Sequence, residues 1–257
     1  MARELLKSYR KLAKGDQLSL FGTTPGQRSA EDPLKFSLEI PKREEYIQQL
    51  KNLANVCTRC SLGKNSREKG KPSVVSKGNL HAKLMVIAEA PAREELMMRI
   101  PLCGPSGRLW HSMLDEAGID ANKLYQTNCI LCQINKTDTS RVKEQLHACA
   151  PYLEHQLYVV RPKFLLALGQ TAMTRLGAPK DASPLEPNVI MFQYQKLPAT
   201  WIAHPAYILR QMETRPIYVE KLVKIKELAE NSYGIDLNKA AMTAAAARVD
   251  SKIVEEL

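Results

Sequence analysis

The sequence has no long apolar run, and its acidic residues are outnumbered by basic ones. No segment approaches the roughly 20 consecutive apolar residues that span a bilayer. Residues 1–14, MARELLKSYRKLAK, alternate charge with leucine and lack the apolar core of a signal peptide. We find no internal repeat. We therefore expect a cytoplasmic monomer with no membrane partner, whose six cysteines are thiols or metal ligands rather than disulfides.

The charge imbalance points to a polyanionic partner. Lys and Arg total 37 against 27 Asp and Glu, a formal net charge of +10. Each neutralised phosphate releases counterions, which favours binding to such a partner. Residues 59–83 hold seven basic residues and one acid in a stretch rich in Gly, Ser and Pro. A solvated loop is the alternative, but the whole-chain charge favours a phosphate-contacting loop, with Lys64 and Arg67 as candidate contacts.

Strand and helix patterns alternate along the middle of the chain. Apolar runs predict strands within 84–90, 124–131, 162–169, 188–195 and 199–204. Helical spacing, caps and glycine stops predict helices within 41–57, 106–118, 140–160, 170–177 and 215–232, the second starting on Ser106 as its cap. This order predicts a three-layer α/β fold around a mostly parallel sheet.

Three regions follow from this pattern. Residues 1–40 form a basic arm and linker, residues 41–232 the compact domain, and residues 233–257 a tail without evident chemistry. In a parallel sheet the functional site lies beyond the carboxyl ends of the strands. The segments EAPA, NCILC, LGQT and HPAYILR all fall there.

The cysteines allow two ligand sets. The CxxC pairs Cys57/Cys60 and Cys129/Cys132 could bind zinc, but the 68 residues between them exceed a compact zinc ribbon. A thioredoxin-like redox pair fits less well, because neither pair opens a helix after a strand. The set Cys57, Cys60, Cys132 and Cys149 suits a [4Fe–4S] cluster, with Cys129 as buried packing. Composition alone does not choose between them.

Seven segments occur in a familiar order: CTRC, AEAPA, PLCGPSGRLW, NCILC, CAPYL, PKFLLALG and HPAYILR. In this order residues 53–212 resemble the iron-sulfur uracil-DNA glycosylases, family 4 of that superfamily. The resemblance implies a three-layer α/β/α sandwich with a central, mostly parallel four-stranded sheet. It also implies a [4Fe–4S] cluster on Cys57, Cys60, Cys132 and Cys149, which leaves Cys129 and Cys103 as non-ligands.

The resemblance assigns roles to the remaining motif residues. A glycosylase reads a flipped nucleotide in a pocket, and Asn128, Leu102 and Ala90 would contact the base. His204 would donate a hydrogen bond to the base O2 as charge accumulates there, and Glu89 would position or activate the attacking water. Leu209 would enter the duplex as a wedge, and Arg210, with Lys64 and Arg67, would contact DNA phosphates. No lysine stands in the motifs as a Schiff-base nucleophile, so we expect a monofunctional enzyme.

The pocket motifs depart from the family pattern. Ala88 and Ala92 replace glycines, Leu102 replaces the phenylalanine that stacks on uracil, and Cys103 replaces a valine. The lost aromatic platform forfeits about 1–3 kcal/mol of stacking per base. This motivates the hypothesis of a damaged or bulkier modified pyrimidine, such as a modified base of phage DNA in antiviral defence. The alternatives are repair of uracil from deaminated cytosine and a clamp-tethered DNA-binding module without catalysis.

A second short motif lies in the arm. Gln17, Leu18, Leu20 and Phe21 belong to QLSLF, which resembles the peptide by which bacterial repair proteins dock on the sliding clamp. An extended peptide with a glutamine anchor and apolar plugs fits a preformed groove. The alternative is that these apolar residues fold back on the core.

Overall fold

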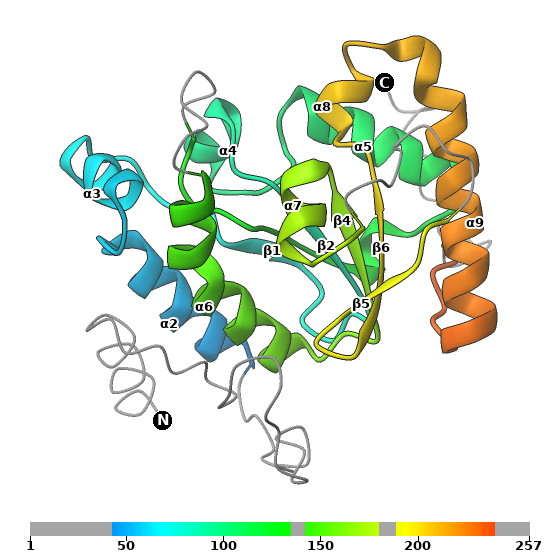
Figure 1. Ribbon diagram of the computed structural model, residues 1–257, viewed down its shortest axis with the longest axis horizontal. Helices are drawn as coiled ribbons and strands as arrows, with labels where there is room; N and C mark the ends of the chain where they lie inside the picture. The colour runs from blue at the N-terminus through cyan, green and yellow to red at the C-terminus, as the bar shows by residue number, and fades with distance from the viewer. Residues whose placement is uncertain (1–42, 135–141, 180–188, 240–257) are drawn as a thin grey trace, which may run out of the picture.

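The computed structural model describes residues 43–134, 142–179 and 189–239 (Figure 1). The QLSLF peptide lies outside the described residues. One sheet has six strands in the order β1-β3-β2-β4-β6-β5. The strands are β1 (Ser76–Gly78), β2 (Leu84–Ala88), β3 (Leu124–Asn128), β4 (Phe164–Leu168), β5 (Phe192–Tyr194) and β6 (Leu197–Ile202).

The four middle strands, β3, β2, β4 and β6, run parallel. They confirm the predicted mostly parallel sheet. The count of four is exceeded because the short strands β1 and β5 pair antiparallel to β3 and β6 at the two edges. Strand β5 lies within the predicted strand at 188–195, whereas β1 was not predicted, because three residues inside the basic stretch 59–83 carry too little apolar sequence to indicate a strand.

Helices cover both faces of the sheet. On one face lie α2 (Arg43–Asn55), α6 (Val142–Val160) and α7 (Gln170–Arg175), and on the other α5 (Pro105–Glu116), α8 (Pro205–Ile208) and α9 (Arg215–Tyr233). The remaining helices are α3 (Ser61–Glu68), α4 (Arg93–Met98) and the 3₁₀ turns η2 (Ala121–Lys123) and η3 (Met212–Thr214). This is the predicted three-layer sandwich (Figure 1).

Strand side chains alternate between two separate cores. Met85 and Ile87 of β2 pack with the α2 and α6 side, whereas Leu84 and Val86 pack with the α5 and α9 side. All four are at most 1 % exposed. Burial on both faces explains why β2 reads as a continuous apolar run rather than as an alternating one.

Two local predictions need correction. The basic stretch 59–83 is not one loop, because it contains helix α3 and strand β1. Cys60 caps α3 by accepting a hydrogen bond from the Gly63 N–H, a cap that the usual Ser, Thr, Asp or Asn signal does not reveal. Helix α5 begins at Pro105 after Gly104, so Ser106 is inside the helix and not its cap.

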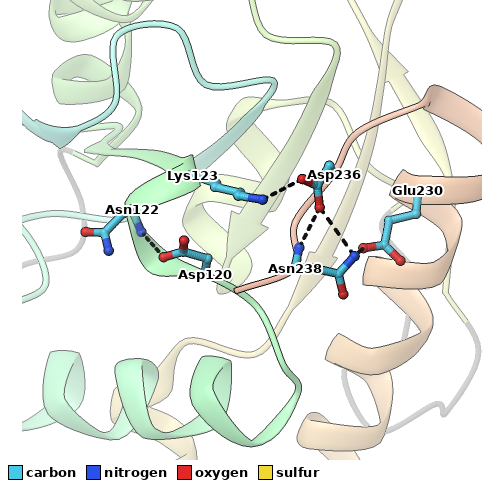
Figure 2. A network of polar contacts seen from close by, with 6 residues as sticks. All are labelled: Asp120, Asn122, Lys123, Glu230, Asp236 and Asn238. Carbon is cyan, nitrogen blue, oxygen red and sulfur yellow. Dashed lines mark hydrogen bonds and ion pairs between the residues drawn. The ribbon is translucent and has the colours of Figure 1, made fainter. Parts of the chain in front are cut away.

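The chain stays packed on the domain beyond residue 232. Ile235 and Leu237 are buried, and the Asp120 N–H donates to the Leu237 carbonyl at 2.9 Å. Figure 2 shows the polar contacts around them, in which Lys123 Nζ lies 2.6 Å from a carboxylate oxygen of Asp236. The part of the predicted tail up to residue 239 therefore belongs to the domain.

In the described segments, the structure contains no helix with the length and apolar character that a membrane crossing requires.

Candidate active site and cysteine cluster

The predicted site residues gather at the carboxyl edge of the parallel strands. Asn128 is the last residue of β3 and pairs in register with Ala88, the last residue of β2, so Glu89 follows directly beside it. The next strands end at Leu168 and Ile202, which also pair, and His204 follows Ile202 by two residues. The fold thus brings Asn128, Glu89 and His204 to one edge of the sheet.

Asn128 presents an unusual side chain for a buried position. The residue is 1 % exposed, and within the described chain neither its amide nitrogen nor its amide oxygen has a hydrogen-bond partner. Buried polar groups without partners cost about 1–3 kcal/mol each. The turn after it is fixed, because the Cys129 and Ile130 N–H groups donate to the Ala88 and Glu89 carbonyls at 2.8 and 2.9 Å. Such an amide is an expected binding group for a ligand with its own donor and acceptor.

Glu89 is half-buried, and its carboxylate is held by a residue of α7, the helix that follows strand β4. The Thr171 hydroxyl on α7 donates to Glu89 Oε1 at 2.8 Å. This bond fixes one carboxylate oxygen and leaves the other able to face a water or a substrate. Thr171 belongs to the LGQT segment after β4, so the contact ties β2 to β4 at the site.

His204 has a defined tautomer when neutral. Its Nδ1 accepts a hydrogen bond from the Ala206 N–H at 3.1 Å, so the ring proton of the neutral imidazole resides on Nε2. The ring is therefore set to donate from Nε2. Gly169, with φ of 86°, allows this placement, since a Cβ there would lie 2.9 Å from the His204 Cβ.

Leu102 is held in a left-handed backbone conformation by three groups. Its φ is 51° and its side chain is 1 % exposed. Its N–H donates to the Glu95 carboxylate, and its carbonyl accepts from Lys77 Nζ at 3.1 Å. Gly107 packs against it so closely that a Cβ would lie 2.2 Å from the Leu102 carbonyl. The residue in place of the family phenylalanine is thus rigidly placed in the interior.

The remaining predicted contacts differ in exposure. Ala90 is half-buried directly after Glu89. Leu209, 41 % exposed, and Arg210, also exposed, end α8 at the same edge of the sheet as His204. Lys64 is exposed on α3.

The four predicted ligand cysteines converge from separate segments. Cys57 and Cys60 precede α3, Cys132 follows β3, and Cys149 lies in α6, and all four are buried free thiols. Burial raises the thiol pKa of Cys60, Cys132 and Cys149, and the charges of neighbouring members of the set raise it further. Cys129 is buried without a place in this set, and burial raises its pKa to about 12. The fold is therefore compatible with the prediction that Cys132 is a ligand and Cys129 is not.

Two half-buried arginines lie next to this cysteine cluster. Arg67 donates to the Ala54 and Asn55 carbonyls at 3.0 and 2.7 Å and approaches Cys132 Sγ at 3.5 Å. Arg59 donates from Nε to the Ala148 carbonyl at 3.1 Å. In this structure the Arg67 guanidinium is engaged by backbone carbonyls and Cys132, and its contact to DNA phosphate stays a prediction.

Two observations in the described residues bear on what the cysteine set could hold. Within the described residues, no three His, Cys, Asp or Glu side chains are gathered closely enough to hold a single metal ion. Around one zinc ion, sulfurs bound at about 2.3 Å lie within about 4 Å of one another. Yet Arg59 Nη1 and Arg67 Nε are buried beside the cysteines without a partner among the described residues. Two unsatisfied cationic donors next to four thiols indicate a place for negative charge.

Comparison with known proteins agrees with this geometry. The family model described as "Uracil DNA glycosylase superfamily" matches residues 75–225, more than half of the chain. The chain belongs to the uracil-DNA glycosylase superfamily. It is 29 % identical over 194 residues to a type-4 uracil-DNA glycosylase of Thermotoga maritima, covering 72 % of this chain and 95 % of the relative. A type-4 uracil-DNA glycosylase of Archaeoglobus fulgidus is 29 % identical over 180 residues, covering 67 % and 87 %.

Sequence reasoning missed three supporting residues of this uracil-DNA glycosylase superfamily member. Thr171 holds Glu89, while Glu95 and Lys77 fix the backbone of Leu102. LGQT was noticeable as a strand-end motif, but its hydroxyl contact depends on the pairing of β2 with β4. Nothing in the sequence marks Glu95 as buried, because glutamate in a first helical turn is ordinarily solvated.

Proposed function

We propose that this superfamily member is a monofunctional DNA glycosylase that hydrolyses the N-glycosidic bond of uracil in DNA. The observation that carries the proposal is the buried Asn128 amide at the carboxyl edge of the sheet, which has no hydrogen-bond partner among the described residues. A pyrimidine edge offers one donor and one acceptor side by side, which match the two amide groups. A flipped base would therefore satisfy both groups and offset their burial.

The neighbouring residues support hydrolysis at this place. As the bond between N1 and C1′ breaks, the electron pair stays on the base and negative charge grows at O2. His204 is suited to donate to that oxygen from Nε2, because its Nδ1 is already occupied as an acceptor. Glu89, anchored by Thr171, orients the water that forms the new bond to C1′ and accepts its proton. The products are a free base and an abasic site in an intact strand.

A modified pyrimidine is the second candidate substrate. Within the described residues no hydrogen bond fixes the Asn128 amide in one orientation, so a half-turn exchanges its donor and acceptor. The amide thus matches the N3–H and O4 of uracil or the N3 and N4–H₂ of a cytosine. Leu102 supplies no ring to stack on the base, which further relaxes selection. Action on modified bases of phage DNA, as an antiviral defence, is the corresponding biological role.

An oligonucleotide panel tests these candidates. Single-stranded and duplex substrates would carry uracil, modified cytosine or modified thymine, and abasic sites would be revealed by alkaline cleavage. We expect the unaltered protein to release at least one of these bases. The excision rate should fall on the order of 100-fold in Asn128→Ala and in His204→Ala. Fast release of uracil alone eliminates the modified-base candidate. No release of any base supports the alternative of a DNA-binding module without catalysis.

The same proposal includes a structural [4Fe–4S] cluster on Cys57, Cys60, Cys132 and Cys149. Four buried thiols support it, together with Arg59 Nη1 and Arg67 Nε, which are buried and have no hydrogen-bond partner among the described residues. Bound there, the cluster would join α3, β3 and α6 through thiolate bonds and would neutralise the two guanidinium groups. Protein purified without oxygen should be brown, with absorbance at about 400 nm. A colourless protein that contains zinc would contradict the assignment.

Contacts to DNA complete the proposal. Leu209 is exposed and follows His204 closely, so it is placed to enter the stack vacated by a flipped nucleotide. Arg210 and Lys64 are exposed cations suited to phosphate. The QLSLF peptide remains a proposed tether to the sliding clamp.

A further inference from the structure

Helix α4 ends in a run of exposed side chains that the residues assigned above do not include. Met97 is 74 % exposed, Met98 62 % and Ile100 38 %, with the exposed Arg99 between them. Single exposed apolar residues are ordinary, but three within four positions form a contiguous apolar surface. We call Arg93, Met97, Met98, Arg99 and Ile100 the α4 rim.

The α4 rim is rigidly attached to the pocket. Glu95, in the same helix and 5 % exposed, accepts from the Ala92 N–H at 2.5 Å and from the Leu102 N–H. Its backbone carbonyl accepts the N–H of Ile100 at 3.2 Å. One buried carboxylate therefore joins the loop after Glu89 to the residue in the base-stacking position. The exposed methionines are consequently held at a fixed place beside the base pocket.

The position and charge of the α4 rim match DNA. Figure 1 shows α4 and α8 apart from one another near the end of the sheet where β6 leads into α8, so the segments that follow Glu89 and His204 approach the site from different sides. Arg93 and Arg99 are exposed beside the methionines, and the nearby acid Glu94 is partly neutralised by Arg108 at 3.2 Å. Apolar side chains flanked by cations are the composition of elements that enter a base step while binding the adjacent phosphates.

We propose that the α4 rim is a second wedge, which inserts Met97 and Met98 into duplex DNA beside the flipped nucleotide, across the site from Leu209. This rests on the proposed function, because it assumes a flipped base in the Asn128 pocket. Methionine is unbranched and polarizable, so it adapts to an irregular gap between bases. The rim compensates for unstacking, and its contribution is therefore specific to double-stranded substrates.

The test compares single-stranded and duplex uracil substrates in full-length protein. The double variant Met97→Gln/Met98→Gln keeps the length of both side chains and removes the apolar surface at these exposed positions. We expect kcat/KM on duplex to fall at least about tenfold and on single strand to change less than about twofold. Met191→Gln, the same replacement at a 37 % exposed site before edge strand β5, is the matched control and should leave both values unchanged. Equal effects on the two substrates, or no effect on either, refute the second wedge.

A binding measurement separates this inference from the proposed function. Arg93→Gln should reduce the slope of log K against log salt for duplex binding by about 0.9 if one phosphate contact is lost. If the unaltered protein releases no base from any substrate, the proposed function fails, and the second wedge is then tested by the affinity for duplex DNA alone. In that case, equal duplex affinities of the unaltered protein and the double methionine variant refute the rim. If the rim instead seats the N-terminal arm, removing residues 1–40 would raise duplex affinity, which also contradicts the proposal.

Discussion

The bond between Thr171 and Glu89 gives a quantitative test of the catalytic carboxylate. A hydrogen bond to a charged group contributes about 1.5–3 kcal/mol, and at about 1.4 kcal/mol per factor of ten this corresponds to a range of about 10- to 100-fold in rate. Both residues are half-buried, so solvent partly replaces the lost donor and the lower end applies. We therefore expect Thr171→Val to slow excision about tenfold. The isosteric valine keeps the packing of α7 and removes only the hydroxyl.

Single-turnover excision from a uracil oligonucleotide is the appropriate assay, because it isolates the chemical step from product release. Thr171→Ser retains the hydroxyl and should keep at least half of the rate. Thr174→Val, at an exposed position of the same helix, controls for the effect of valine on α7. The reasoning is refuted if Thr171→Val lies within twofold of the unaltered enzyme, or if the serine variant is as slow as the valine variant.

Three further predictions concern the cluster, a buried histidine and the arm. Cys132→Ser should abolish the absorbance at about 400 nm, whereas Cys129→Ala should retain it. Absorption spectra recorded without oxygen measure both outcomes. Burial lowers the pKa of His155 to about 4 from 6.5, so stability is full above pH 6.5 and falls toward pH 4. The two pKa values differ by about 2.5, which at about 1.36 kcal/mol per unit of pKa sets an upper limit of about 3.4 kcal/mol on this loss. Urea unfolding of His155→Gln should show a weaker loss of stability at acid pH. Deleting residues 17–21 should abolish clamp binding in a pull-down and spare excision; loss of folding would favour packing of the peptide on the core.

The parallel strands were predictable because burial on both faces leaves a direct trace in sequence. In β2 and β4 every residue is buried, so the apolar runs have no alternation and end where the chain leaves the sheet. The residues just after those ends, Glu89 and the LGQT segment, are then placed at one edge by the parallel pairing alone. The site prediction needed only this rule and the order of the motifs.

What escaped prediction depends on contacts between segments far apart in sequence. Arg67 carries the same charge as the exposed Lys64 three residues earlier, and only the fold turns one inward and the other outward. A glutamate in a first helical turn is ordinarily solvated, yet the Glu95 side chain is buried, where the backbone N–H groups of Ala92 and Leu102 donate to it. Charge patterns report how many cations a segment has, but not which of them the core takes up.

The turn after β3 links the proposed cluster to the proposed base pocket. Asn128 at its start is the proposed base reader and Cys132 at its end is a proposed cluster ligand, with only three residues between them. The turn is held at both ends, since Ile130 donates to the Glu89 carbonyl and Val74 donates to the Leu131 carbonyl at 2.8 Å. Because the Asn128 amide has no hydrogen-bond partner within the described chain, its position depends on the backbone that carries it. A cluster bound through Cys132 would therefore contribute to base recognition by fixing Asn128, although it takes no part in the hydrolysis.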